Sequence, residues 1–426
     1  MLLKENHLAV VTVILSFVGW LLVGCTAEAA AVPTLMAPAM TVAFPTSAAF
    51  VPAGDNPPPT WTPGAVTADS QDQPFTGLGP SRTPTPLPIF PTSTPRPPTA
   101  TPTPPEVSPT PYVSLIPRLP PTNQLGPSKL GIHVVRNNDP AIMEFVRRAQ
   151  PAVIKAVDDL GFLAEVKAAS PRTITVGRLS ATNQDYVGTP EEAARRFVAE
   201  QLTRYRLNPA VDYWEGWNEP DPGLGRMGWY ARFEQERVRL MALHGLRAAI
   251  GGFPTGVPEL DEFELFLPAI DTAIQHGGIL TLHEYGAPDL TFLYGAPLPG
   301  MPAYPDRGAL KFRYRWFYRE ILEPAGMVIP LVVSEAGVDG IIGNRPGPDG
   351  LGWHHFQDYW VAQGWGRSGV EAFINQLNWY DNGVREDGYV IGFAIFTAGG
   401  IDYWRNYDIN PILPQLADYV VGQRGR

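Results

Sequence analysis

From residue 129 to the end of the chain, short apolar runs alternate with longer stretches in which apolar residues recur every three to four positions. Short runs rich in Val, Ile and aromatic residues predict buried strands, and a 3.6-residue period predicts helices. Strands that alternate with helices favour a parallel sheet covered by helices. The expected strands are 130–135, 152–157, 173–178, 211–217, 248–253, 279–285, 329–334 and 389–396.

The clearest helix start is Thr189-Pro190-Glu191-Glu192, ahead of a helical stretch at 190–205. Threonine is a good N-cap, proline suits the first turn, and acidic side chains stabilise the positive end of the helix dipole. Residues 233–248 and 263–276 also follow a helical period. Eight strand–helix units within residues 128–426 predict an α/β fold, the (β/α)8 TIM barrel. The alternative is a doubly wound open sheet, but no glycine-rich phosphate loop follows the first strand.

A different pattern fills the first 25 residues. Lys4 precedes an apolar run from Leu8 to Leu22, shorter than the roughly 20 apolar residues that a transmembrane helix needs. The run ends in Leu22-Val23-Gly24-Cys25, which resembles a bacterial lipobox, where the thiol is acylated. We therefore expect residues 1–25 to be a lipoprotein signal peptide with lipidation at Cys25. The alternative is a plain N-terminal anchor helix with an incidental cysteine.

Residues 26–127 follow neither period, and they hold 26 of the 47 prolines of the chain. Threonine–proline repeats such as Thr101-Pro102-Thr103-Pro104 stay extended and solvated, because proline fixes φ and donates no backbone hydrogen bond. This segment is expected to be a disordered spacer that lifts residues 128–426 away from a lipid surface. The lone cysteine, Cys25, leaves no partner for a disulfide within the chain.

Charge restricts the partners. The net charge of −10 argues against a nucleic-acid partner, since binding nucleic acid calls for a basic face. A neutral polysaccharide or oligosaccharide bound by stacking and hydrogen bonds suits an acidic chain with 11 tryptophans. The expected membrane contact is the lipid anchor alone. The chain is thus expected to be exported and held on the extracytoplasmic side of a bacterial membrane, at the cell surface.

Two glutamates end expected strands, and such barrels carry their chemistry at the carboxyl ends of the strands. Strand four ends in Trp214-Glu215-Gly216-Trp217-Asn218-Glu219-Pro220, and strand seven ends in Val332-Val333-Ser334-Glu335. Glycosidic cleavage needs one carboxylic acid to protonate the leaving oxygen and one carboxylate at the sugar carbon. Glu219 and Glu335 are therefore the candidate catalytic pair. We expect their carboxyl groups to lie about 5 Å apart, the separation of retaining enzymes.

With these motifs the chain resembles the retaining glycoside hydrolases of clan A, which share the barrel and place Asn-Glu after strand four and a glutamate after strand seven. The resemblance covers residues 129–426. It implies that Glu219 is the general acid/base, that Glu335 is the nucleophile and that Asn218 contacts the sugar. His283-Glu284-Tyr285 at the end of strand six looks like the His-x-Tyr of the clan. Tyr285 would then bond the nucleophile, and His283 would line the site near the acid/base.

The chain also departs from the clan. Many members carry an arginine after strand two, whereas this chain has Lys155 within that strand and Arg178 at the end of strand three. Many place a tryptophan at the end of strand eight, where this chain has Phe396. The run Trp217-Asn218-Glu219-Pro220-Asp221 resembles the Asl1-like cell-wall glucanases. The family within the clan is left open.

Further substrate contacts are expected from residues at strand ends and in the loops that follow. His133 either contacts sugar or packs in the core, and Arg178 either orients Glu335 or pairs with another acid. Glu215 and Glu284 are expected to face away from the catalytic pair. Tryptophans in or beside strand-end loops are candidates for stacking on sugar rings; they are Trp217, Trp229, Trp353 and Trp404.

No cofactor or metal is expected, because His354-His355 has no third ligand at a diagnostic spacing and the proposed chemistry needs no ion. The sequence therefore predicts a retaining glycoside hydrolase that cleaves β-linked polysaccharide outside the cell. Two alternatives remain. One is a non-catalytic glycan-binding barrel displayed at the surface, and the other is a transglycosylase that uses the same glutamates. The sequence does not distinguish endo from exo action, nor does it identify the sugar.

Overall fold

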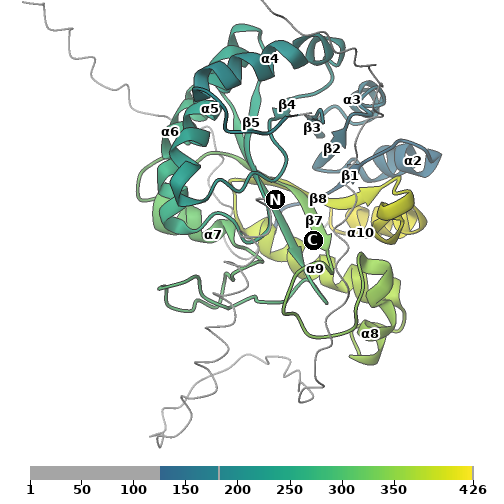
Figure 1. The fold of residues 1–426 in the computed structure, drawn as a ribbon. Helices are drawn as coiled ribbons and strands as arrows, with labels where there is room; N and C mark the ends of the chain where they lie inside the picture. The colour runs from purple at the N-terminus through teal and green to yellow at the C-terminus, as the bar shows by residue number, and fades with distance from the viewer. Residues whose placement is uncertain (1–124, 181–182, 425–426) are drawn as a thin grey trace, which may run out of the picture. The chain divides into compact units, whose positions relative to one another are not determined.

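The computed structural model describes residues 125–180 and 183–424 (Figure 1). The expected signal peptide at 1–25, its Cys25 and nearly all of the expected spacer lie outside the described residues. Leu125 and Gly126 already contact the folded part, because the Arg385 guanidinium donates to both of their carbonyl oxygens. Within the described ranges, no helix has the length and apolarity needed to cross a bilayer.

Eight parallel strands close into a barrel in sequence order, with β1 paired to β8. The expected (β/α)8 fold is therefore confirmed for the described part of the chain. Each observed strand overlaps an expected one. The strands are β1 Leu130–Val134, β2 Val153–Val157, β3 Ile174–Arg178, β4 Tyr213–Glu215, β5 Ala248–Phe253, β6 Ile279–Gly286, β7 Leu331–Val338 and β8 Val390–Ala398.

Helices surround the barrel, and α4, α5 and α6 follow one another around its outside (Figure 1). The α-helices are α2 Pro140–Ala149, α3 Leu163–Ala169, α4 Pro190–Leu207, α5 Gly223–Leu243, α6 Leu260–Gln275, α7 Tyr314–Phe317, α8 Gln357–Ala362, α9 Gly369–Glu386 and α10 Leu413–Gly422. Short segments complete the connections. These are the π-helix η1 Tyr318–Leu322 and the 3-10 helices η2 Trp353–Phe356, η3 Asp402–Tyr407 and η4 Asn410–Ile412.

Local sequence explains where the helices begin. Thr189 caps α4 through a reciprocal pair of hydrogen bonds with Glu192, as its sequence predicts. The helix expected at 233–248 is wrong in its bounds, since α5 begins at Gly223 and ends at Leu243. The glycines upstream of residue 233 are typical of a loop. The first turns of α5 nevertheless bury apolar side chains such as Met227. Burial on the barrel thus outweighs the low helix propensity of glycine.

The inside of the barrel is apolar in one layer and charged in the next. The apolar cluster takes one residue from each of six strands: Val153, Val176, Ala249, Ile279, Val332 and Ala394. Side chains two residues apart in a strand share a face. Lys155 and Arg178 therefore follow Val153 and Val176 on the inner face. This charged layer lies at the carboxyl end of the barrel, where the glutamates are.

A buried ion pair joins α5 to the strands that carry the first glutamate. The Arg237 guanidinium donates to Glu234 Oε2 at 2.7 Å, to the carbonyl of Trp214 at 3.1 Å and to that of Ala249 at 2.7 Å. Both charged side chains are fully buried. A Cβ on Gly216 would lie 2.9 Å from the atoms of this pair, so only glycine fits where β4 ends.

Replacing Arg237 with Met should lower the free energy of unfolding by about 3–5 kcal/mol, because Glu234 would remain buried without its counter-charge. Arg195→Met is the matched control, since Arg195 pairs with Glu236 at 3.3 Å on the surface and such pairs contribute about 0–1 kcal/mol. Denaturant titrations of both variants measure the difference. Equal losses would contradict the structural role given to the buried pair.

Candidate active site

Glu219 and Glu335 meet at the mouth of the barrel. A carboxylate oxygen of each and a ring nitrogen of His283 all lie within 4.8 Å of one another. This fits the separation of about 5 Å found in retaining glycosidases. The two environments differ, because the Glu335 side chain is 7% exposed and that of Glu219 is 40% exposed. One carboxyl group is therefore enclosed, and the other faces the entrance.

Glu335 lies within β7, not beyond its end as the sequence suggested. Lys155 donates to its Oε1 at 2.9 Å, and the Tyr285 hydroxyl donates to its Oε2 at 2.9 Å. The Arg178 guanidinium and His133 Nε2 are each 3.6 Å from Oε1. Four strands thus direct polar groups at one carboxylate.

These neighbours keep Glu335 ionised. Burial alone would raise the pKa of its carboxyl group, but His283, Lys155, His133 and Arg178 together hold that pKa well below its usual range. Burial lowers the pKa of His133 itself to about 3, so this ring is neutral near pH 7. His133 therefore adds no charge there, and the groups that offset the charge of Glu335 are His283, Lys155 and Arg178.

Lys155 also bonds a second acid. Its ammonium lies 2.7 Å from Glu215 Oε2, and both side chains are almost fully buried. Burial opposes ionisation of Glu215, but Lys155 and Arg178 outweigh it and lower the pKa of Glu215 to about 2. The expectation that Glu215 faces away from the site is wrong, because its carboxylate bonds Lys155, an inner-face residue of β2, inside the barrel. A lysine within the apolar run Val153–Val157 was the signal for this cluster.

Glu284 does face away from the site, as expected. Its carboxylate accepts hydrogen bonds from the backbone N–H groups of Phe312 and Tyr314 and from the Tyr380 hydroxyl. These contacts lie behind β6, between the sheet and its helices. Glu284 therefore anchors the loop that follows β6 and takes no place beside the catalytic pair.

Glu219 follows β4 in a left-handed backbone conformation with φ of 47°, which is uncommon for a residue other than glycine. Its N–H donates to the carbonyl of Gly252 at 3.0 Å. A Cβ on Gly252 would lie 3.0 Å from the carbonyl oxygen of Trp217. The φ of Gly252 is 61°, in the left-handed region that favours glycine. Glycine at this point of β5 thus permits the close approach that fixes the loop carrying Glu219.

His283 bridges the two glutamates. Its Nδ1 lies 2.8 Å from Glu219 Oε1 and 3.5 Å from Glu335 Oε2. Nε2 is buried, and no described residue bonds it. His133, in turn, shares a hydrogen bond of 2.7 Å between its Nδ1 and the Thr397 hydroxyl. Both histidines therefore face the glutamates from the inside of the barrel.

Asn218 lies beside Glu219, and its backbone is held by Gln184 from the loop before α4. The Gln184 amide accepts from Asn218 N–H at 2.6 Å and donates to the Asn218 carbonyl at 2.9 Å. The side-chain oxygen of Asn218 is buried and receives no hydrogen bond from the described residues. This oxygen is therefore an acceptor that the described residues leave unpaired. No sequence pattern indicates the contact with Gln184.

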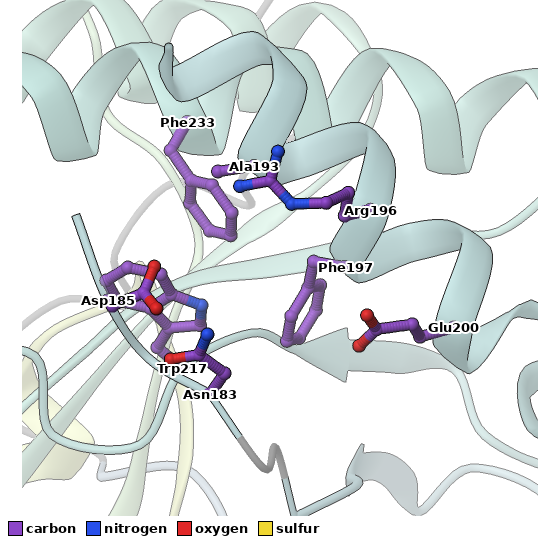
Figure 2. Close-up of a pocket in the computed structure, with 8 residues that line it drawn as sticks. All are labelled: Asn183, Asp185, Ala193, Arg196, Phe197, Glu200, Trp217 and Phe233. Atoms are coloured by element: carbon purple, nitrogen blue, oxygen red, sulfur yellow. The ribbon is translucent and has the colours of Figure 1, made fainter. Parts of the chain in front are cut away.

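The structure corrects the stacking role expected of two tryptophans. Trp217 is 3% exposed and packs against Phe233 at 4.8 Å between ring centroids. It lines a hollow under α4 and α5, into which Phe197 and Phe233 point from those helices (Figure 2). Neither Glu219 nor Glu335 lines this hollow. Trp353 is 2% exposed and stacks on Phe373 at 5.1 Å. Both rings are core residues, because neighbouring rings cover their faces.

Two other tryptophans have faces that are only partly covered. Trp229 lies inside α5 instead of in a loop, and it stacks on Phe233 at 5.9 Å. Trp404, in η3 beyond β8, is 39% exposed and contacts Phe396 edge-on at 5.0 Å. Phe396 in turn contacts His133 at 4.7 Å. Trp404 is therefore the expected stacking residue whose position beside the mouth still suits a sugar.

Among residues 125–180 and 183–424, the one group of three acidic, histidine or cysteine side chains placed to share an ion is Glu219, His283 and Glu335. A metal ion there would compete with Lys155 and Arg178 for Glu335, and their positive charges would repel it. His354 and His355 make backbone contacts instead. His354 donates to the Asp408 carbonyl at 2.8 Å, and His355 accepts from Leu351 N–H at 2.8 Å.

Comparison with known proteins gives fold-level similarities only. No protein-family model and no curated protein matches the chain. Similar solved structures include a family 39 glycoside hydrolase from Bacteroides cellulosilyticus, 15% identical with a TM-score of 0.46 over 70% of this chain and 64% of that one. The endo-β-1,4-mannanase of Thermotoga petrophila is 12% identical, with a TM-score of 0.40 over 72% of this chain and 79% of that one.

A β-1,3-glucanase from Cryptomeria japonica pollen is 11% identical, with a TM-score of 0.40 over 66% of this chain and 95% of that one. The chain thus spans less than two thirds of the Bacteroides enzyme, although it spans nearly all of the pollen enzyme. With TM-scores below 0.5, these similarities carry no argument about chemistry. The chemistry of the site is inferred from the geometry of the two glutamates.

Replacing Lys155 with Met should lower the free energy of unfolding at pH 8 by about 3–5 kcal/mol, because Glu215 and Glu335 would lose their shared counter-ion. One of the two should then bind a proton with a pKa above its unfolded value. Stability of the variant should therefore rise as the pH falls from 8 towards 5, while no such gain comes from these groups in the native chain. Denaturant titrations across this range measure it.

Lys167→Met is the control for that experiment. Lys167 pairs with Asp212 at a partly exposed position, so its loss should cost less and show no recovery on acidification. A Lys155→Met protein whose stability is independent of pH between 8 and 5 would contradict the charge balance described for Glu335.

Proposed function

We propose that this chain is a retaining glycoside hydrolase that cleaves β-linked polysaccharide, with Glu335 as nucleophile and Glu219 as general acid/base. The observation that carries the proposal is the pair of carboxylate oxygens within 4.8 Å, one enclosed and one open to solvent. A retaining mechanism needs this separation, because the nucleophile must touch the sugar carbon while the acid reaches the leaving oxygen.

In the first step, protonated Glu219 gives its proton to the glycosidic oxygen as the Glu335 carboxylate attacks the anomeric carbon. The bond to the leaving sugar breaks, and a glycosyl ester forms on Glu335. The low pKa of Glu335 supplies the ionised nucleophile, and Lys155 and Tyr285 hold its two oxygens in place. His283 lies against Glu219 and fixes the orientation of the acid.

In the second step, the Glu219 carboxylate takes a proton from a water molecule, which attacks the anomeric carbon. The ester bond breaks, Glu335 is released as a carboxylate, and the sugar leaves with its original configuration. The exposure of Glu219 lets water reach it, and the buried Asn218 amide oxygen offers an acceptor for a sugar hydroxyl nearby. Each of the two glutamates thus acts in both steps.

The closed barrel, with one glutamate after β4 and one in β7, supports assignment to glycoside hydrolase clan A. The family within the clan is unresolved. The similar structures are named as a glycoside hydrolase, a glucanase and a mannanase, which accords with a carbohydrate substrate for this chain. Because identity is 11–15%, the proposed activity depends on the geometry of this chain's own glutamates.

We also propose export and anchoring of the chain through an acylated Cys25, with residues 26–127 as a stalk. The support is the sequence alone: the apolar run of Leu8 to Leu22 before Cys25, and the proline-rich composition that follows. Such a stalk would hold the barrel clear of the lipid surface, where a polymer is accessible.

Full-length protein should release reducing ends from at least one member of a panel of β-glucans, mannans, xylans and galactans. Glu335→Gln should abolish release, because an amide is a poor nucleophile. Glu219→Gln should retain a larger share of its rate on aryl glycosides with good leaving groups than on polysaccharide, because such groups leave without an acid. Glu264→Gln, at an exposed position on α6, is the control and should keep full activity.

Full activity in a folded Glu335→Gln protein would refute the role of Glu335. Binding to a glycan without release of reducing ends would favour a glycan-binding barrel instead. Longer oligosaccharides with no gain in reducing ends would indicate transglycosylation. The sizes of the released products distinguish endo from exo cleavage.

A further inference from the structure

The loops after β7 and β8 carry a polar and aromatic wall beside the catalytic pair. Its members are Asp339, Tyr403, Trp404 and Tyr407, and we call this set the β7–β8 wall. The Tyr407 hydroxyl donates to Asp339 Oδ1 at 2.8 Å, which joins the two loops. Ring centroids link Tyr403 to Trp404 at 4.8 Å and Trp404 to Tyr407 at 5.5 Å.

The wall is continuous with the catalytic site. Tyr407 contacts Phe396 at 5.6 Å, and Phe396 contacts Tyr285, the residue that bonds Glu335, at 6.1 Å. Asp339 follows the last residue of β7, and its N–H donates to the Gly286 carbonyl at 3.1 Å. Since alternate residues of a strand share a face, Asp339 lies on the same face as Glu335 but farther out along the strand.

One carboxylate oxygen of Asp339 accepts no hydrogen bond from the described residues. Its Oδ1 accepts from Tyr407 and from Ile341 N–H at 3.2 Å, while no hydrogen bond from a described residue reaches Oδ2. Burial first, and then the nearby charges of Glu219 and Glu335, raise the pKa of Asp339 to about 6. At pH 7.5 its carboxylate is therefore ionised, with an oxygen open to a hydroxyl donor.

The outer edge of the wall is apolar and exposed. Trp404 is 39% exposed, Ile401 beside it is 36% exposed, and Ile341 in the β7 loop is 65% exposed. Trp404 is linked to the Asp339 carboxylate through Tyr407. An exposed indole and a carboxylate acceptor in one wall can bind a sugar, because the C–H face stacks on the aromatic ring while hydroxyl groups donate to the acid. Exposed apolar side chains at the mouth of a site commonly mark a ligand surface.

We propose that the β7–β8 wall is a binding subsite for an uncharged pyranose next to the sugar that is cleaved, with Trp404 as its stacking face and Asp339 Oδ2 as its hydroxyl acceptor. The inference rests on the proposed glycosidase function and adds its substrate class: neutral glycans, with uronate-containing glycans excluded.

Charge explains the exclusion. A sugar carboxylate at this wall would meet three acids, namely Asp339, Glu219 and Glu335. The cations Lys155 and Arg178 are already directed at Glu335 and Glu215. Arg345, the basic residue of the β7 loop whose pKa Asp339 influences, donates to the carbonyls of Gly340, Pro346 and Pro348 instead. Arg405, exposed in η3 next to Trp404, adds one cation to this side of the site, and the three acids still outnumber it.

Binding is measured by calorimetry at pH 7.5 with full-length Glu335→Gln protein, so that no turnover occurs. The probes are neutral β-glucan, mannan, xylan and galactan hexasaccharides, and a mannuronate hexasaccharide for the acidic class. At least one neutral probe should bind more tightly than the uronate. Adding Asp339→Asn or Trp404→Ala should weaken that binding about tenfold, which is the loss of one charged hydrogen bond or one stacked ring.

Asp402→Asn is the matched control, because Asp402 is an exposed acid in the same 3-10 helix outside the wall, and it should leave affinity unchanged. Unchanged affinity in both wall variants, tightest binding of the uronate, or no binding of any probe would overturn the subsite. The proposed hydrolysis can fail separately. In that case the native chain would bind a neutral probe, with the same dependence on Asp339, and release no reducing ends.

Discussion

The site depends on one buried ammonium group. Lys155 lies between Glu215 and Glu335, 2.7 Å and 2.9 Å from their oxygens, at a depth where neither carboxylate could stay ionised alone. Without it, two acids would share a proton and the nucleophile would be lost. An apolar layer lies beneath, and Val153 of this layer stands two residues before Lys155 in β2. It excludes water, so each buried carboxylate needs a positive counter-charge nearby. The chemistry proposed for Glu335 follows from this arrangement more than from its own position.

The second carboxyl group is fixed by backbone geometry. Arg237 ties the carbonyls of β4 and β5 to α5, and glycines at 216 and 252 allow the close approach of neighbouring atoms there. Glu219 is thereby held in a left-handed conformation, with its carboxyl group against His283 and open to solvent. The strand ends thus hold Glu335 as an enclosed, ionised carboxylate and Glu219 as an exposed carboxyl group oriented by His283. Such division of environment is how paired carboxylates take different roles.

Much of this was predictable, because the barrel follows from the alternation of periods and each strand was found within a few residues. It was harder to predict which side chains face the inside of the barrel. Strict alternation from Val332 would turn Ser334 inward and Glu335 outward, but the β7–β8 pairing shifts between Val333 and Ala336 and reverses the facing. Glu215 was misplaced for a different reason: β4 pairs with β5 without a register shift, and the Glu215 side chain turns into the barrel, where it bonds Lys155. Trp217 and Trp353 were misplaced because position in sequence near a strand end does not reveal which layer covers a ring. The contacts of Asp339 and Gln184 join loops far apart in sequence, and no local pattern encodes them.

The central claim is that two carboxylates at this separation cleave a β-glycosidic bond through an ester on Glu335. The most direct test follows the anomeric proton of the first product by NMR, on a β-linked substrate that the chain hydrolyses and before mutarotation. The account predicts that the β anomer appears first and the α anomer grows in later. Initial release of the α anomer would contradict it, because inversion requires a water molecule between carboxyl groups roughly 6.5–9.5 Å apart.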